Sequence, residues 1–235
     1  MKAGVAQIGL CNEIGTNLVK ILSYLGSAAS LGLNFLCFPE CCLTGYKRNF
    51  YNISWDELAQ AIDKLQEAVI AEGITIAVGT PYVEADKIYN AAILISAKYR
   101  LKYFKNNLTD FDKKYFTEGK ERLLFEVAKV KCGLLICRDQ NDPRLVQEYA
   151  RMGAKVIFLP AAHYYPLPEA RRKVDKNRAL PIARAVENSL FIAKANAVGF
   201  QGDYANFGHS MIVNPEGLVV CEAGEEEETL LYHDL

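Results

Sequence analysis

The chain has 235 residues, 51% of them hydrophobic and 23% charged, and its formal net charge is −1. Proteins that bind nucleic acid usually carry an excess of basic residues, so this balance does not support that class. The apolar content excludes a disordered chain, and no apolar run approaches the roughly 20 residues of a membrane span. A chain of this length buries about 70% of the surface that it exposes when unfolded, so a stable core needs neither disulfides nor a metal.

Seven cysteines are present, an odd number, and the first ten residues lack the apolar segment and cleavage site of a signal peptide. We therefore expect free thiols in a reducing, cytoplasmic compartment. The spacings among Cys37, Cys41 and Cys42, and between Cys132 and Cys137, match no zinc site, so no metal is expected. Most free cysteines are small core residues, which leaves open whether one of them is reactive.

The first half of the chain alternates strand and helix patterns. Short apolar runs predict buried strands, and apolar residues at helical spacing predict helices that stop at Gly32 and Gly73. Ser54, three residues before Glu57, indicates a capping box at the start of the second helix. In order, we expect a strand at 2–10, a helix at 17–30, a strand at 34–38, a helix at 54–72, a strand at 74–79, a hairpin at 82–96 that turns at 85–87, and a strand at 99–104.

The second half repeats this alternation, so residues 1–235 are predicted to form a single α/β domain with helices outside buried sheets. Pro181 lies in a segment of helical composition, where we expect it to kink or restart the helix. The charge run at 225–228 is interpreted as a solvated turn. In order, we expect a strand at 130–136, a helix at 143–152, a strand at 155–159, a helix at 172–188, and strands at 190–195, 209–213, 218–221 and 229–232.

Two chemically useful side chains stand at the ends of apolar strands. Glu40 follows the run at 34–38, and Pro39 fixes its exit from that strand. A partly desolvated carboxyl group has the raised pKa that a general base requires, although a salt-bridged structural glutamate fits as well. Cys137 follows another apolar strand and precedes Arg138 and the start of a predicted helix, an environment that can favour the thiolate; a core cysteine is the alternative.

Lys105 ends an aromatic stretch and, taken alone, fits a surface charge as well as a site residue. Seven segments in a fixed order give a stronger signal. They are VAQIG near the start, FPECCLTGY around Glu40, KNNL at Lys105, GLLICRDQNDPR around Cys137, GAKVIFLPAA, RAVENSLFIAKANAVG and GHSMIVNPEG. On these segments the chain resembles the nitrilase superfamily, the carbon–nitrogen hydrolases, over essentially its whole length.

The resemblance implies a four-layer α-β-β-α sandwich and a Glu-Lys-Cys site that needs no metal or organic cofactor. By position, Glu40 matches the family's general base, Lys105 its lysine and Cys137 its nucleophile. Lys102 is a neighbouring candidate, but Lys105 has the leucine three residues later that the family pattern shows. The resemblance also implies a homodimer or higher homo-oligomer, although the chain stops before the C-terminal extension that the family often uses in subunit contacts.

The implied mechanism is a two-step acyl transfer. Glu40 takes the thiol proton of Cys137, and the thiolate attacks an amide carbonyl. Lys105 and the backbone N–H of Arg138 stabilise the oxyanion. Glu40 then protonates the leaving amine and activates the water that hydrolyses the thioester. The expected substrate is a small amide or N-carbamoyl compound, and the candidates to bind it are Tyr46, Arg138 and His163. Arg138 alternatively pairs with Asp139 or another acid.

Two rival functions stay open. Asp112 stands where the family often has a second glutamate, and Asn107 where it commonly has a histidine. These departures leave room for a nitrilase-like binding protein without catalysis, although Asp112 is also a candidate to orient the lysine. An acyltransferase, in which an amine replaces water at the thioester, would use the same residues. Selective labelling of Cys137 by an electrophile tests the first rival, and product analysis with added amines tests the second.

Overall fold

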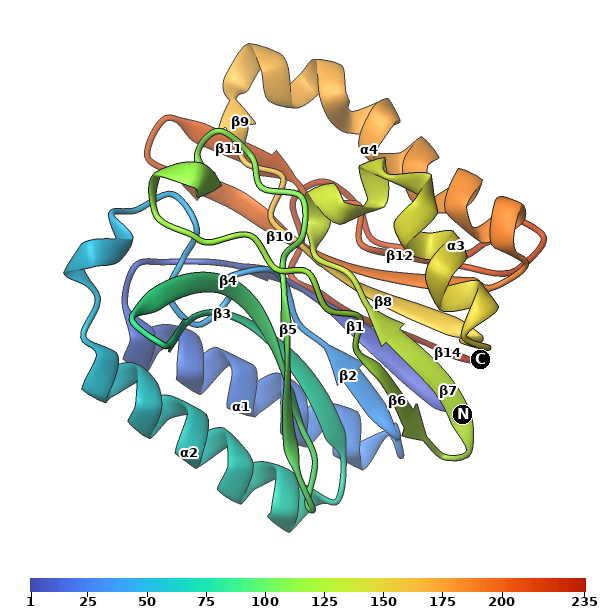
Figure 1. The fold of residues 1–235 in the computed structure, drawn as a ribbon, viewed down its shortest axis with the longest axis horizontal. Coiled ribbons are helices and arrows are strands. Elements are labelled where there is room, and N and C mark those ends of the chain that lie inside the picture. Colours follow the sequence, from blue (N-terminus) through green and yellow to red (C-terminus); the bar gives the residue numbers. More distant parts are fainter.

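The computed structural model describes residues 1–235, and its elements form four layers (Figure 1). Two β-sheets lie in the middle. Helices α1 (Ile14–Ser30) and α2 (Trp55–Glu72) cover one outer face, and helices α3 (Pro143–Arg151) and α4 (Leu167–Asn188) cover the other. The predicted α-β-β-α sandwich is therefore confirmed. None of these helices combines the length and apolarity that a membrane crossing requires.

The first sheet holds the strands of the N-terminal half and the last strand of the chain. Its three central strands are parallel, and the outer ones are antiparallel to their neighbours. Ala85 and Asp86, both at positive φ, make the tight turn of the predicted hairpin. In spatial order the sheet contains β14 (Thr229–Asp234), β1 (Lys2–Gly9), β2 (Phe35–Cys37), β3 (Thr75–Glu84), β4 (Lys87–Ile95) and β5 (Arg100–Phe104).

The second sheet holds the strands of the C-terminal half. It joins the first sheet where the ends of β1 and β10 pair in parallel, with Ile8 opposite Ala197. Two short strands, β11 (Tyr204–Phe207) and β9 (Tyr165–Pro166), extend one end of β10. In spatial order the sheet contains β6 (Leu124–Val127), β7 (Val130–Leu134), β8 (Val156–Ala161), β10 (Phe191–Gln201), β12 (Met211–Val213) and β13 (Val219–Glu222).

The core lies on both faces of each sheet, which is why the central strands read as continuous apolar runs. Between the sheets, the ring of Phe35 on β2 stacks on the ring of Phe158 on β8, with centroids 4.0 Å apart. The next residue, Leu36, points to the opposite face and joins the cluster that includes Ile21 of α1 and Leu65 of α2. Alternation within one strand thus packs β2 against a sheet on one side and against helices on the other.

The ends of the helices follow local chemistry. Ser54 caps α2 by accepting a hydrogen bond from the backbone N–H of Glu57, and Gly73 ends that helix at a φ of +68°. Helix α4 begins at Leu167, earlier than the predicted residue 172, because Pro168 fits the first turn of a helix, where no backbone donor is needed.

Pro181 lies inside α4, which runs from Leu167 to Asn188 without a break, so of the predicted kink or restart the restart does not occur. A proline has no N–H, so the carbonyl of the residue four positions earlier, Asn177, loses its helical partner. Lys194 of β10 supplies another donor, because its buried Nζ donates a hydrogen bond to the Asn177 carbonyl at 3.0 Å. The helix therefore continues through the proline with that carbonyl satisfied.

Other departures from the predicted elements are short. The pattern missed β6, β9 and β11, which have two to four residues each, and β12 begins at Met211 because His209 has a positive φ of 56°. The acidic run is more than a solvated turn. Glu228 accepts a hydrogen bond from the Gly9 backbone and pairs with Lys20 at 2.5 Å, so the run fastens the chain near its end to the end of β1.

Candidate active site

Loops that follow four strand ends meet at one edge of the two sheets. Glu40 follows β2, Cys137 follows β7 and His163 follows β8. These strands point the same way, since the parallel pairings β2–β1–β10–β8–β7 link them. Lys105 follows β5, which shares this direction because two antiparallel pairings separate it from β3. Carboxyl ends of parallel strands are where α/β proteins commonly build their sites.

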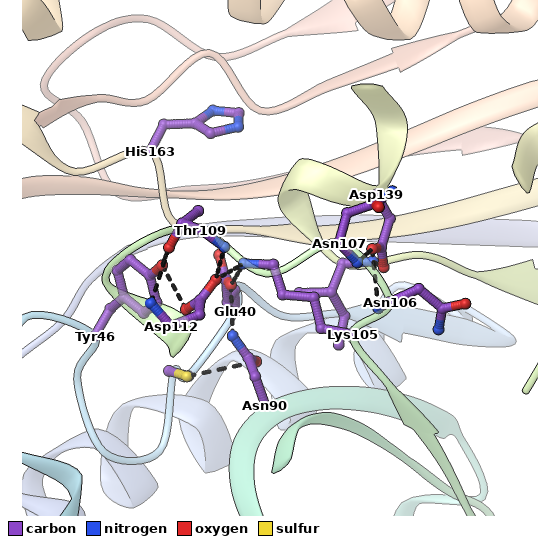
Figure 2. A network of polar contacts seen from close by, with 12 residues as sticks. Glu40, Tyr46, Asn90, Lys105, Asn106, Asn107, Thr109, Asp112, Asp139 and His163 are labelled. Atoms are coloured by element: carbon purple, nitrogen blue, oxygen red, sulfur yellow. Dashed lines mark hydrogen bonds and ion pairs between the residues drawn. The ribbon is translucent and has the colours of Figure 1, made fainter. Parts of the chain in front are cut away.

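Lys105 lies fully buried between two carboxylates (Figure 2). Its Nζ is 2.6 Å from Oε1 of Glu40 and 2.7 Å from Oδ2 of Asp112, and neither carboxylate is exposed. The structure thus places three predicted site residues in direct contact. Burial lowers the pKa of Lys105, but the charges of its acidic neighbours outweigh burial and hold this pKa well above its usual range. The lysine is therefore a permanent cation.

The two carboxyl groups that share Lys105 differ in pKa. Burial raises the pKa of Glu40, and the Asp112 charge adds to that rise. The Lys105 charge opposes the rise only in part. Burial acts on Asp112 in the same direction, but the Lys105 charge and hydrogen bonds from Thr109 and Tyr46 outweigh it and lower the pKa of Asp112. Asp112 is a fixed anion, whereas the raised pKa of Glu40 makes it the better suited of the two to accept and give up a proton.

Glu40 is held by close backbone contacts and by one amide. Gly79 of β3 lies so near that a Cβ atom there would come within 2.3 Å of the Pro39 carbonyl, so only glycine lets β3 approach. Asn90 of β4 donates from Nδ2 to Oε1 of Glu40 at 2.7 Å. The other oxygen, Oε2, is buried and accepts no hydrogen bond. An asparagine inside the apolar stretch of β4 is the sequence signal for this contact, which was not predicted.

Asp112 is positioned by a short turn of its own. The backbone N–H of Thr109 donates to Oδ2 of Asp112 at 2.9 Å, and the Asp112 backbone donates to the Thr109 hydroxyl at 3.0 Å. Tyr46, predicted to bind substrate, donates from its hydroxyl to Oδ1 of Asp112 at 2.8 Å. The Tyr46 hydroxyl therefore helps to position Asp112, the carboxylate that pairs with Lys105.

Cys137 begins a 3-10 turn, Cys137–Asn141, and has a positive φ of 46°, which is rare for a residue with a side chain. The carboxylate of Asp139 fixes this turn. It accepts from the Ile136 backbone at 2.9 Å and from the Tyr103 hydroxyl at 2.8 Å. It also accepts from the backbone of the two residues after Lys105, Asn106 and Asn107, at 3.0 and 2.7 Å.

Asp139 thus ties the Cys137 turn to the Lys105 loop, as Figure 2 shows on the lysine side. In the sequence this carboxyl stood out only as an alternative partner for Arg138. That pairing is absent, because Asp139 is buried among four other donors while Arg138 is exposed and forms no ion pair. Burial raises the pKa of Asp139 to about 6, and its backbone donors oppose the rise.

The Cys137 thiol is neutral at rest. Burial raises its pKa well above the ordinary value, the Glu40 charge adds to the rise, and Lys105 and the backbone at Ala162 oppose it. The predicted thiolate-favouring environment is therefore wrong. Its two premises fail, since Arg138 points to the surface and helix α3 begins only at Pro143. A base is needed to remove the thiol proton.

A cavity of about 350 Å³ reaches Cys137, and all three predicted substrate-binding residues line it. Tyr46 is held by Asp112, and Arg138 stands exposed at the wall. His163 is buried with its Nδ1 unpartnered, and burial together with the Lys194 charge holds its pKa well below the ordinary value. The alternative lysine, Lys102, pairs with Glu84 at the surface and lies outside this cavity.

A model of carbon-nitrogen hydrolases matches residues 2–235. The chain belongs to the carbon–nitrogen hydrolase family. It is 31% identical to the 2-oxoglutaramate amidase of Bacillus subtilis (strain 168), over 82% of this chain and 74% of that protein. It is 30% identical to omega-amidase NIT2 of Mus musculus, over 100% of this chain and 88% of that protein.

Solved structures of one amidase have nearly the same fold as this chain. A mutant of the Nesterenkonia AN1 amidase from the nitrilase superfamily superposes with a TM-score of 0.90 at 25% identity, covering 100% of this chain and 90% of that one. A second structure, of a mutant of that amidase in which a glutamate is replaced by glutamine, is 26% identical with a TM-score of 0.90 and the same coverage, and carries the acetamide moiety of fluoroacetamide on its active-site cysteine. The predicted superfamily is therefore confirmed.

Proposed function

We propose that this carbon–nitrogen hydrolase is a small-molecule amidase that works through a thioester on Cys137, with Glu40 as base and Lys105 as the fixed cation. The observation that carries the proposal is the buried Glu40–Lys105–Asp112 cluster beside a cysteine that opens into a cavity. Its amidase relatives supply the reaction class. Burying three charged groups is costly, and a chain that only bound a ligand would gain nothing from this arrangement.

The first step forms the acyl-enzyme. The unpartnered Oε2 of Glu40 takes the proton from the neutral Cys137 thiol, and the sulfur attacks the carbonyl carbon of the amide. The carbonyl oxygen becomes an oxyanion stabilised by the Lys105 ammonium and the backbone N–H of Arg138. Each such donor contributes on the order of 10²- to 10³-fold in rate.

The second step releases the acid. Protonated Glu40 gives its proton to the departing nitrogen as the carbon–nitrogen bond breaks, so ammonia or an amine leaves and a thioester remains. Glu40, again ionised, takes a proton from water, and the resulting hydroxide attacks the thioester carbonyl. The carbon–sulfur bond then breaks, the sulfur regains a proton from Glu40, and the carboxylic acid departs. Asp112 stays ionised throughout, because the Lys105 charge lowers its pKa.

The test is an ammonia-release screen over small amides, N-carbamoyl compounds and nitriles. We expect release from amides by the wild-type protein and none above background by Cys137→Ala. The matched control is Cys221→Ala, since Cys221 lies on β13 and lines no part of the cavity. Undiminished turnover in a purified, folded Cys137→Ala protein would overturn the assignment. Transfer of the acyl group to added hydroxylamine in preference to water would favour the acyltransferase.

We also infer a cytoplasmic homo-oligomer. Val186 of α4 and Leu218 are 53% and 58% exposed, and both lie near Gly217 on the outer α3–α4 side. Exposed apolar side chains that gather on one face are typical of subunit interfaces. Light scattering is expected to give a mass well above the 26.2 kDa of one chain. A species of one-chain mass at micromolar concentration would contradict the oligomer.

A further inference from the structure

The wall of the cavity that reaches Cys137 carries more positive than negative charge. Its basic residues are Lys47, Arg138, Lys173 and Lys176, and its acidic residues are Asp110 and Glu169. Glu169 is paired with Lys173 at 2.5 Å, and Asp110 approaches Lys113 outside the wall. The other three basic residues, Lys47 among them, have no carboxylate within ion-pair distance.

Lys47 differs from the other two because it is only partly exposed and is held in place. Its backbone N–H donates to Oε1 of Gln201 at 2.8 Å, and the same oxygen accepts from the Tyr46 backbone at 3.1 Å. Its Nζ lies 4.3 Å from the ring centroid of Phe111, 4.6 Å from that of Tyr204 and 5.0 Å from that of Tyr46. Aromatic rings stabilise a cation without neutralising it.

A partly desolvated cation that faces a cavity and has no carboxylate partner favours an anionic ligand. We propose that Lys47 is a specificity-determining residue that binds a carboxylate on the acyl portion of the substrate, so that the preferred substrates are monoamides of small dicarboxylic acids. The inference rests on the proposed amidase function. The cavity, about 350 Å³, suits a molecule of a few carbon atoms with an amide at one end and a carboxylate at the other.

A second role for Lys47 makes a different prediction. The charges of Asp112 and Glu40 act on Lys47 and partly offset the lowering of its pKa by burial, so the lysine could serve only to balance the cluster. In that case its removal would impair neutral and anionic amides alike. Carboxylate binding instead predicts that its removal impairs anionic amides alone.

The experiment compares matched amides. The monoamides of succinic and glutaric acid are paired with the uncharged butyramide and pentanamide, and kcat/KM is measured for wild type, Lys47→Met, Lys47→Glu and the surface control Lys98→Met. We expect wild type and Lys98→Met to prefer the anionic member at least tenfold. Lys47→Met should lose about 10- to 100-fold on anionic amides, mainly through KM, and less than threefold on neutral ones. Lys47→Glu should reverse the preference.

Equal losses on both members of a pair, or no preference in wild type, would overturn the inference and leave the amidase proposal standing. A binding measurement tests the role of Lys47 independently of amidase activity. In calorimetry, Cys137→Ala should bind the monoamide of succinic acid with a Kd at least tenfold lower than that of Cys137→Ala/Lys47→Met. If wild type releases ammonia from neither anionic nor neutral amides while this difference in affinity holds, the amidase proposal fails and Lys47 keeps its role in carboxylate binding. Equal affinities of the two variants would contradict that role.

A second, independent observation concerns Lys194. This side chain is fully buried on β10 and has no carboxylate within ion-pair distance, and its Nζ contacts the Asn177 carbonyl that Pro181 leaves free. Burial lowers the pKa of Lys194 to about 7, so the amine is readily neutral and still donates a hydrogen bond. Asn177 lines the same cavity as Cys137, as do Glu169, Lys173 and Lys176 of α4.

We infer that Lys194 is a positioning residue that holds the Asn177 turn of α4 against the cavity by replacing the hydrogen bond that Pro181 cannot make. The substitution Pro181→Ala restores an N–H four residues after Asn177, so it should compensate for the loss of Lys194. Lys194→Met alone should raise KM several-fold with little change in kcat, and the double variant Pro181→Ala/Lys194→Met should return KM to within about twofold of Pro181→Ala.

Folding itself is part of this test. If Lys194→Met does not fold, the double variant is expected to fold and to bind substrate normally. An unchanged KM in a folded Lys194→Met protein would contradict the positioning role. Failure of Pro181→Ala to restore either KM or folding would contradict the hydrogen-bond explanation.

Discussion

The buried cluster of Glu40, Lys105 and Asp112 and the wall of the adjoining cavity differ in how their charges are paired. In the cluster the lysine contacts both carboxylates, and all three side chains are buried. On the wall, Lys47 and Arg138 have no carboxylate partner, and His163 has an unpartnered ring nitrogen. Under the proposed mechanism, the groups that carry out the reaction are already paired before substrate binds, whereas the groups that face the substrate gain their partners from it.

The largest effect should follow from removing the base. Glu40→Gln keeps the size of the side chain but cannot accept the Cys137 proton, so kcat/KM for amides should fall by about 10²- to 10⁴-fold. Steady-state ammonia release measures this loss. The control is Glu84→Gln, because Glu84 pairs with Lys102 at the surface. A loss below tenfold for Glu40→Gln would show that another group takes the thiol proton.

Removing the cation should weaken both rate and stability. Lys105→Met leaves two buried carboxyl groups without their shared partner, so unfolding should become easier by about 3–5 kcal/mol and kcat should fall by at least 10²-fold. Urea denaturation and steady-state kinetics measure the two effects. Lys102→Met is the matched control, since its surface ion pair is worth less than about 1 kcal/mol. Similar behaviour of the two variants would contradict the distinction drawn between these lysines.

A pH profile separates the two carboxyl groups. The Asp112 charge raises the pKa of Glu40, so Asp112→Asn should lower that pKa. Since kcat/KM requires ionised Glu40, its acid limb should move to lower pH, while the plateau falls about tenfold because Lys105 loses one anchor. An acid limb that moves to higher pH, or stays in place, would contradict the assignment of Glu40 as the titrating base.

The smallest effect on rate should come from Asp139, which links the Cys137 turn to the Lys105 loop. Asp139→Asn loses one of two acceptor oxygens and places an amide against backbone donors, so stability should fall by about 2–4 kcal/mol and kcat severalfold. Asp142→Asn, in the cap of α3, is the control and should leave kcat unchanged. Circular dichroism melts and kcat measure the difference. Equal kcat values in the two variants would show that the link has no effect on the reaction.

The sequence predicted the layers, because strand and helix periods and ordered motifs are local signals. The same motifs led to Glu40, Lys105 and Cys137, which the structure places after strands that point the same way. It did not predict Asn90 or Asp139, since each acts on a partner 30 to 50 residues away and their side-chain contacts depend on packing. The thiol pKa was misjudged for the same reason. Neighbours in sequence suggested a thiolate, whereas burial and the distant Glu40 determine the neutral form. Lys194 and Pro181 each looked anomalous alone, and only the fold brings the donor to the free carbonyl.

Covalent labelling followed by peptide mass mapping tests the role of Cys137. Wild-type protein is incubated for a short time with chloroacetone, an alkylating agent that has a carbonyl group but no carbon–nitrogen bond to hydrolyse, then digested and analysed at every cysteine. The proposed reaction predicts one adduct, on Cys137, with the partly exposed Cys11 and Cys221 unmodified at the same time point, although accessibility alone would favour them. Adducts formed on Cys11 or Cys221 as fast as on Cys137 would contradict an activated nucleophile at this site.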